Sequence, residues 1–282
     1  MRVTWITGSG GLIGNYLLQS AATFAPGFQV IGLTREDLDL ENSGEVRRLF
    51  AEQKPGLIIH CAAISKSPVC QANPGLARRI NVDVTALLAE LAADLPLLFL
   101  STDLVFDGKS GNYEESAAVN PLSIYAETKV AAEKIVRQNP RHAVIRTSLN
   151  GGVSPTGDRG FNEEMRRAWQ KGDTLNLFTD EFRCPIPAAV TARAIWELAL
   201  GNRPGLYHVA GSERLSRWQI GRLLSARWPQ LNPKIHAGTL KDYTGAPRSP
   251  DTSLNCAKAQ KLLNFQLPGL TEWLAENPGE VF

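Results

Sequence analysis

The sequence predicts an α/β protein in which a doubly wound parallel sheet is covered by helices on both faces. Short, uninterrupted apolar runs alternate with longer amphipathic stretches through the first half of the chain. Such runs are typical of strands buried on both faces, and the stretches between them are long enough for the covering helices. A glycine-rich turn stands directly after the first apolar run, where such a fold passes from strand to helix.

The first half of the chain predicts strands and helices in strict alternation. Strands are expected at Val3–Thr7, Phe28–Leu33, Leu57–Cys61, Leu97–Ser101 and Ala143–Thr147. Helices are expected at Leu12–Ala22, Gly44–Glu52, Leu76–Ala93 and Ser123–Arg137. Two parallel strands need a long crossover, which is usually a helix, so this order builds one parallel sheet.

The second half is less regular and predicts a smaller set of elements. They are expected at Phe161–Lys171, Val190–Leu200, Leu206–Ala210, Trp218–Arg227 and Leu270–Ala275. The turn-rich stretch Gly151–Gly160 predicts a mobile loop, and Pro229–Pro250 is repeatedly interrupted by proline and glycine.

A length of 282 residues suits two domains, at roughly 150 residues for each. We expect residues 1–150 to form the first domain, with 190–210 returning to its sheet. Residues 151–189 and 211–282 are expected to form a smaller C-terminal α/β domain that binds the substrate. A cleft between the two domains is the expected place for a ligand.

Composition excludes several classes of function. Lys and Arg number 30 against 28 Asp and Glu, so the excess of basic residues that marks nucleic-acid binders is missing. The longest apolar run, Leu95–Leu100, is too short to cross a membrane, and the N-terminus lacks the features of a signal peptide. The cysteines are too scattered for a disulfide framework or a metal site: Cys61, Cys70, Cys184 and Cys256. We therefore expect a cytoplasmic enzyme or ligand-binding protein.

The glycine-rich turn predicts a dinucleotide site. Gly8 permits the tight turn, Gly11 lets the backbone approach a pyrophosphate, and Gly14 allows the helix to pack closely on the strand. The helix N-terminus supplies N–H donors and the positive end of a dipole. A Rossmann-type first domain follows from this turn. The cofactor contacts expected there are Gly8, Ser9, Gly10, Gly11, Leu12 and Ile13.

The end of the second strand bears on the choice of cofactor. In such folds an acidic residue here binds the ribose 2′-hydroxyl, whereas an arginine accommodates a 2′-phosphate. The sequence Thr34-Arg35 favours NADP(H), while Glu36 and Asp37 directly afterwards leave NAD(H) possible.

Tyr125 and Lys129 stand four residues apart in a predicted helix, so they share one face a turn apart. A neighbouring ammonium stabilises a phenolate, which suits the tyrosine for acid–base chemistry on a hydroxyl or carbonyl. Thr102 ends the fourth strand, and the carboxyl ends of parallel strands are where ligands bind. These three residues are the candidate catalytic residues.

Together the segment Gly8–Gly14, Thr102, Tyr125 and Lys129 resemble the extended short-chain dehydrogenases/reductases. Within that superfamily, Leu100–Gly108 resembles the STDYVFDG segment of the dTDP-4-dehydrorhamnose reductase family. Further matches run along nearly the whole chain, at His60–Ala63, Ile80–Val82, Ile145–Ser148, Asp180–Pro185 and Gly205–Gly211.

The resemblance implies reduction of a ketone, favouring a nucleotide-linked 4-keto-deoxysugar, with hydride from NADPH and a proton from Tyr125. Thr102 would hydrogen-bond the carbonyl oxygen, and Lys129 would hold the nicotinamide ribose. Other implied cofactor contacts are Asp39, Leu40, Cys61, Ala62, Ala63 and Ser148. Implied substrate contacts are Asp103, Leu104, Leu149 and Arg183. No metal is implied, and the superfamily suggests a homodimer.

Two departures from the family pattern bear on the substrate. Leu104 replaces the tyrosine of STDYVFDG, and Leu149 replaces a frequent aromatic residue, so the usual dTDP-sugar is in doubt. From its residue type, Arg183 would either clamp a substrate diphosphate or carboxylate or form a structural ion pair. Two alternatives to a reductase stay open: an epimerase of the same fold, and a non-catalytic NADP-binding regulatory subunit resembling that of methionine adenosyltransferase.

Overall fold

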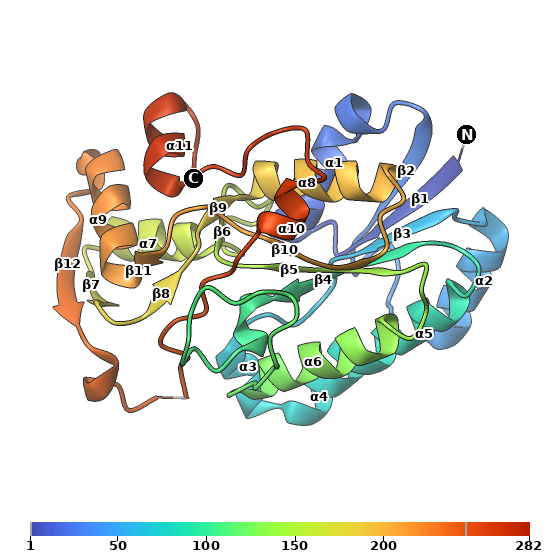
Figure 1. Cartoon of the computed structure of the whole chain (residues 1–282), viewed down its shortest axis with the longest axis horizontal. Helices are drawn as coiled ribbons and strands as arrows, with labels where there is room; N and C mark the ends of the chain where they lie inside the picture. Colours follow the sequence, from blue (N-terminus) through green and yellow to red (C-terminus); the bar gives the residue numbers. More distant parts are fainter. Residues whose placement is uncertain (1, 246) are drawn as a thin grey trace.

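The computed structural model describes residues 2–245 and 247–282 and is built on a six-stranded parallel sheet (Figure 1). The strand order is β10-β5-β4-β3-β1-β2. The strands are β1 (Arg2–Thr7), β2 (Phe28–Leu33), β3 (Leu57–His60), β4 (Leu97–Thr102), β5 (Ala143–Thr147) and β10 (Gly205–Val209). Every neighbouring pair is parallel, which confirms the predicted fold class.

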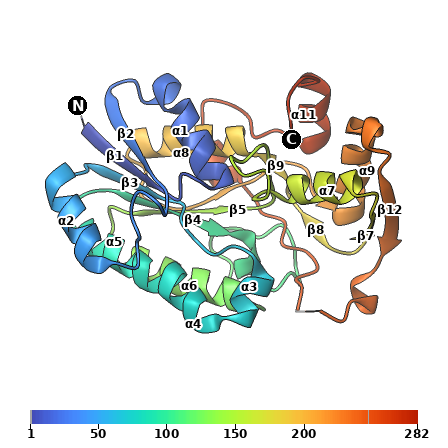
Figure 2. The same ribbon diagram turned by 180° about the vertical axis from the view of Figure 1, so that it is seen from behind.

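Helices cover both faces of this sheet. On one face lie α1 (Leu12–Phe24), α8 (Ala188–Leu200) and the short α10 (Ala257–Gln260). On the other lie α2 (Ser43–Gln53), α5 (Val84–Leu91) and α6 (Ile124–Val136), and Figures 1 and 2 show the two layers. Successive strand residues enter opposite cores: Ile6 packs with α1 and α8, whereas Trp5 packs with α2 and α5. This two-sided burial explains why the strands are uninterrupted apolar runs.

The helix expected at Leu76–Ala93 is not regular. It consists of α4 (Pro74–Arg78), a π-helical turn (Arg79–Asp83) and α5, and a further helix, α3 (Ser67–Ala72), precedes it. The π-turn faces Asn81 inward and buries it. Such turns add one residue to a helical repeat, so a pattern of apolar residues does not reveal them.

The second half contains α7 (Phe161–Gln170), α9 (Arg217–Arg227) and α11 (Leu270–Glu276), which pack around a core of their own at one end of the molecule (Figure 2). Three two-stranded sheets accompany them. They are β7 (Thr174–Phe178) with β12 (Lys234–Gly238), β8 (Phe182–Arg183) with β11 (Leu215–Ser216), and β6 (Asn150–Gly151) with β9 (Ile186–Pro187). The sequence patterns predicted none of these strands.

The loop between β6 and α7 is held by hydrogen bonds to one carboxylate, that of Glu163. Glu163, in the first turn of α7, accepts backbone N–H groups of Ser154 at 2.7 Å and of Arg159 and Gly160 at 2.8 Å each. Its oxygens also accept the Ser154 hydroxyl. The predicted loop is therefore an irregular segment that is hydrogen-bonded to the helix that follows it.

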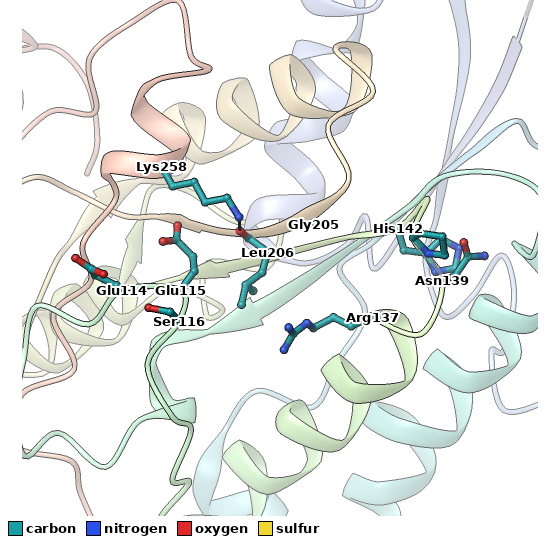
Figure 3. Close-up of a pocket in the computed structure, with 10 residues that line it drawn as sticks. Glu114, Glu115, Ser116, Arg137, Asn139, His142, Gly205, Leu206 and Lys258 are labelled. Carbon is teal, nitrogen blue, oxygen red and sulfur yellow. Dashed lines mark hydrogen bonds between the residues drawn. The ribbon is translucent and has the colours of Figure 1, made fainter.

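The outer edge of β10 is covered by two charged side chains. The Lys258 ammonium donates to the Leu206 carbonyl at 2.8 Å, and a Glu115 oxygen accepts from the His208 N–H at 2.9 Å. A groove of about 510 Å³ opens beside this edge (Figure 3). Within the described part of the chain, no helix combines the length and the apolar character needed to cross a membrane.

Candidate active site

The glycine-rich turn is packed tightly between β1, β3 and α1. Gly8 has a φ of +71°, and a Cβ atom there would lie 2.6 Å from the Ala62 backbone nitrogen. A Cβ atom on Gly14 would collide with the Gly8 carbonyl. The turn therefore requires glycine at both positions, and the Ala62 backbone, just after β3, lies directly beside it.

The N-terminus of α1 is open to a ligand. Gly11 is its N-cap and has no side chain to accept the N–H groups of the first turn, where Leu12 and Ile13 lie. The Ser9 hydroxyl is buried and lacks a hydrogen-bond partner among the described residues. Gly10 also lacks a side chain, so the backbone stays accessible. Free N–H donors and a buried hydroxyl without a partner fit a pyrophosphate.

The end of β2 leaves one arginine free. The Thr34 N–H and hydroxyl donate to the Asp37 carboxylate at 2.9 Å and 2.6 Å, and these bonds lower its pKa. Arg35 is exposed and forms no ion pair within residues 2–245 and 247–282. Asp39 is also exposed, whereas Leu40 packs against the core beneath α2. Glu36 and Asp37 left the choice between NADP(H) and NAD(H) open. One of them, Asp37, is already hydrogen-bonded to Thr34.

Tyr125 and Lys129 lie on the inner face of α6, which begins after the N-cap Ser123. Their side chains are buried, at 9% and 2% exposure. The Lys129 Nζ lies 3.9 Å from the centre of the Phe99 ring. Burial lowers the pKa of Lys129 to about 7, against the opposing effect of the Glu133 carboxylate. The ammonium is thus poised to lose its proton near neutral pH.

The sequence predicts that the Lys129 ammonium lowers the pKa of Tyr125, but in the structure this pKa is raised. Burial raises this pKa well above its usual value, and the nearby Thr102 hydroxyl opposes that rise only in part. The phenol is therefore protonated at neutral pH. A protonated phenol is suited to donate a proton to a carbonyl oxygen.

Asp103 and Arg183 are paired with each other. The Arg183 Nη1 atom donates to Asp103 Oδ2 at 2.6 Å, and the two residues are only 6% and 2% exposed. The Ser148 hydroxyl donates to the same oxygen at 2.6 Å. Of the two possibilities for Arg183, the structure shows the structural ion pair. The prediction that both residues contact substrate stays a prediction.

The two leucines that replace family aromatics lie in separate clusters. Leu104 packs with Tyr125, Cys70 and Ile64. Leu149 packs against the core of the second half, between α7 and the end of the chain. Leu104 therefore adds an apolar wall next to the candidate proton donor, and Leu149 lies within a different group of side chains.

Asn81 lies in the Ile80–Val82 match to the family pattern, but it was not among the predicted site residues. Its Oδ1 accepts from the Ile64 N–H at 2.8 Å, and its Nδ2 donates to the Ile64 carbonyl at 3.1 Å and to Thr128 Oγ1 at 3.0 Å. Thr128 lies between Tyr125 and Lys129 on α6. Asn81 thereby joins the segment after Ala63 to α6, and the π-turn directs its side chain inward.

The residues at the end of β3 are neutral. His60 is buried between the Thr7 and Thr85 hydroxyls, at 2.6 Å and 3.1 Å, and burial lowers its pKa to about 3. Burial also raises the pKa of the Cys61 thiol to about 12, although the Lys129 charge opposes this shift. Neither group is ionised at pH 7. Among the described residues, no cluster of His, Cys, Asp and Glu has the composition of a metal site.

We compared the sequence with those of known proteins and protein families. Residues 1–278 match the model of a family described as "RmlD substrate binding domain". A dTDP-4-dehydrorhamnose reductase of Sinorhizobium fredii is 28% identical over 95% of this chain and 93% of its own. Methionine adenosyltransferase 2 subunit beta of Xenopus laevis is 28% identical over 93% of this chain and 82% of its own.

A solved structure shares the fold. It is the dTDP-4-dehydrorhamnose reductase of Bacillus anthracis in complex with NADP, with a TM-score of 0.86. The match covers 98% of each chain at 24% sequence identity. At this identity the likeness concerns the fold alone.

Proposed function

Because this chain belongs to the family described as RmlD substrate binding domain, we propose that it is an NADP(H)-dependent reductase of a ketone. A nucleotide-linked 4-keto-deoxysugar is the favoured substrate. The name of the Sinorhizobium fredii relative supports this choice, since that protein is a dTDP-4-dehydrorhamnose reductase. The proposal covers the whole chain, because the family match extends over residues 1–278.

One observation carries the proposal. A buried, protonated Tyr125 lies near the Thr102 hydroxyl, at the carboxyl end of β4. Lys129 follows one turn later on the same helix face, close to Cys61 and the segment beside Gly8. A proton donor and a dinucleotide-binding turn are thus at the same edge of the sheet, as reduction of a carbonyl requires.

The residues present fit NADP(H). The turn of Gly8 to Gly11 and the first N–H groups of α1 would hold the pyrophosphate, and the free Ser9 hydroxyl would gain a partner. Arg35 would meet the 2′-phosphate, which favours NADP(H) over NAD(H). Ala62, Ala63 and Ser148 would line the rest of the site. When bound, the cofactor supplies the hydride.

The side chains of this protein would manage the proton. Tyr125 donates its phenolic proton to the ketone oxygen as the carbon atom is reduced, and the alcohol product keeps that proton. The Lys129 ammonium stabilises the phenolate that remains and would also hold the nicotinamide ribose. A pKa of about 7 for Lys129 means that its charge is present in acid solution, is half lost near neutral pH and is absent in alkaline solution.

The test is a screen for oxidation of NADPH with nucleotide keto-sugars and simpler ketones. We expect turnover with at least one of them. Tyr125→Phe should lower kcat by about 100-fold or more, because general acid catalysis contributes roughly 10² to 10⁴. It should leave the Kd for NADPH nearly unchanged. Equal turnover by this variant contradicts the mechanism, and analysis of the same mixtures for epimers tests the epimerase alternative.

A second function is favoured by one specific finding, the similarity to methionine adenosyltransferase 2 subunit beta. We infer that a non-catalytic NADP-binding subunit is the alternative role. Tight binding of NADPH without turnover of any ketone in the screen would support this role. Such a protein is then expected to bind a partner enzyme, which can be sought by adding a methionine adenosyltransferase and measuring its activity.

A further inference from the structure

Arg217 carries a positive charge that has no counter-ion among the described residues. It is the first residue of α9 and directly follows β11. Its guanidinium forms no hydrogen bond or ion pair within residues 2–245 and 247–282. The side chain is partly buried, and burial lowers its pKa to about 10, so it is charged at neutral pH. Because a charge withdrawn from water is unfavourable without a partner, this guanidinium is suited to an anion.

The pairing of β8 with β11 places Arg217 next to other charged residues. Leu215 is paired with Arg183 in this antiparallel ladder. Two residues further on, Arg217 stands opposite Glu181, and its N–H donates to the Glu181 carbonyl at 2.9 Å. Residues directly opposite each other in such a ladder have Cβ atoms about 4.5–5.5 Å apart. Consistent with this closeness, the charges of Glu181 and Arg183 both act on the pKa of Arg217.

The carboxylates of this group are already bound by other arginines. Glu181 accepts from Arg248 Nε at 2.6 Å and from Arg248 Nη2 at 3.1 Å, and Arg183 Nε lies 3.6 Å from it. Asp103 accepts from Arg183 Nη1 at 2.6 Å. Three guanidinium groups therefore share two carboxylates, and the charge left without a partner is that of Arg217.

One side of this group reaches the candidate catalytic residues. Arg183 contacts Asp103, which is 2% exposed and directly follows Thr102 in the chain. The charge of Arg183 also acts on the pKa of Tyr125. The group of arginines is thus joined to the carboxyl end of β4, where the proton donor lies.

The other side reaches the predicted cofactor site. The carbon at the centre of the guanidinium lies 5.3 Å from the centre of the Phe161 ring. Gly160 precedes this ring, and a Cβ atom there would lie 3.3 Å from Leu12 in the first turn of α1. Further along α7, Glu164 forms an ion pair with Lys66 at 3.6 Å. A molecule bound at this guanidinium therefore has both the cofactor turn and the proton donor nearby.

We propose that Arg217 binds the anionic group of the substrate, an inference that rests on the proposed function. In a nucleotide-linked keto-sugar this group is the diphosphate. A guanidinium can donate two parallel hydrogen bonds to phosphate oxygens, and the phosphate then compensates the free charge. The sugar extends from there past Arg183 toward Tyr125. No bond is made or broken at Arg217.

Binding of nucleoside diphosphates tests this site without any turnover. We expect the full chain, saturated with NADP⁺, to bind dTDP or UDP in isothermal titration calorimetry. Arg217→Ala should weaken this binding by about 10- to 100-fold. Arg217→Lys keeps the charge but not the paired donors, so it should lose less. Arg222→Ala, which removes an exposed arginine of the same helix, is the matched control and should change the Kd by less than about twofold.

Steady-state kinetics separates the binding of an anion from a general effect on the fold. With a nucleotide keto-sugar, Arg217→Ala should raise KM about 10- to 100-fold and keep kcat within about threefold. With a neutral ketone, KM should change by less than about twofold, and so should the Kd for NADPH. An equal rise in KM for charged and neutral ketones would overturn the inference. A loss of NADPH binding in place of dTDP and UDP binding would also overturn it, since Arg217 would then serve the cofactor.

The inference and the proposed function fail in different ways. A wild type that reduces no ketone refutes the proposed function, whereas calorimetry still reports the anion site. A wild type that binds neither dTDP nor UDP would overturn the inference, as would an Arg217→Ala protein that binds them as tightly as the wild type. Should Arg217→Ala fail to fold, Arg217→Gln keeps most of the aliphatic stem and is expected to show the same loss of binding.

Discussion

At the scale of single residues, the expected chemistry depends on which charges are already compensated by a neighbour. Asp37 is bound by Thr34, and Asp103 and Arg183 neutralise each other. Arg35 has no such partner among the described residues and stays exposed at the end of β2. A free guanidinium can meet a phosphate with two parallel hydrogen bonds. Arg35 is therefore the residue on which cofactor preference is expected to depend.

Arg35→Ala should weaken binding of NADPH by about 10- to 100-fold, because hydrogen bonds to charged groups contribute roughly 1.5–3 kcal/mol. Binding of NADH, which has no 2′-phosphate, should change by less than about twofold. Fluorescence titration with both cofactors measures the two Kd values. Arg203→Ala, another exposed arginine that lies after α8, is the control and should change neither. An equal loss for NADPH and NADH would remove the assignment of Arg35 to the phosphate.

At the scale of elements, the feature that bears on stability and association is the sheet edge formed by β10. β10 is an edge strand, and exposed edges can pair with other chains. Here Lys258 covers the Leu206 carbonyl (Figure 3). Glu115 covers the His208 N–H, so two outward-facing backbone groups of β10 are occupied. These two side chains close part of the edge without adding a strand.

Glu115→Ala with Lys258→Ala should uncover this edge. We expect the free energy of unfolding to fall by about 1–3 kcal/mol for each backbone group that loses its partner. At high protein concentration the variant should also form a larger species than the wild type. Denaturant unfolding and light scattering after gel filtration measure the two effects. Glu114→Ala with Lys261→Ala, which removes two exposed charges nearby, should show neither change.

At the scale of the whole molecule, the fold buries several groups in their neutral form. His60 lies at the end of β3 and His208 in β10, and burial lowers both pKa values to about 3. The Arg146 guanidinium beside His208 adds to this shift. In the unfolded chain both rings have a pKa near 6.5, so the unfolded state binds more protons between these limits. Acid therefore favours unfolding.

The free energy of unfolding should be insensitive to these histidines above pH 6.5 and should decline as the pH falls from 6.5 toward 3. Each histidine contributes about 1.4 kcal/mol per pH unit in this window. Urea unfolding at several pH values measures the slope. His208→Gln should make this slope shallower than in the wild-type protein. An unchanged slope in this variant would contradict this account.

Much of the fold and part of the candidate site follow from local patterns. The β–α alternation, the turn at Gly8 and the spacing of Tyr125 and Lys129 are each contained in a short stretch of sequence. The periodicity of apolar residues reports such stretches because burial repeats along the strand or helix. The parallel sheet was predicted for this reason. So was the placing of Thr102 at the end of β4.

Tertiary structure alone decided the rest. The pairing of Arg183 with Asp103, the placement of Asn81 by a π-turn and the strand pair β7–β12 join residues that are distant in the sequence or depend on one inserted helical residue. The pKa of Tyr125 is another case, since the burial that raises it comes from neighbours on several elements. A sequence pattern records which residues repeat along one element, whereas contacts between elements depend on how the whole chain packs.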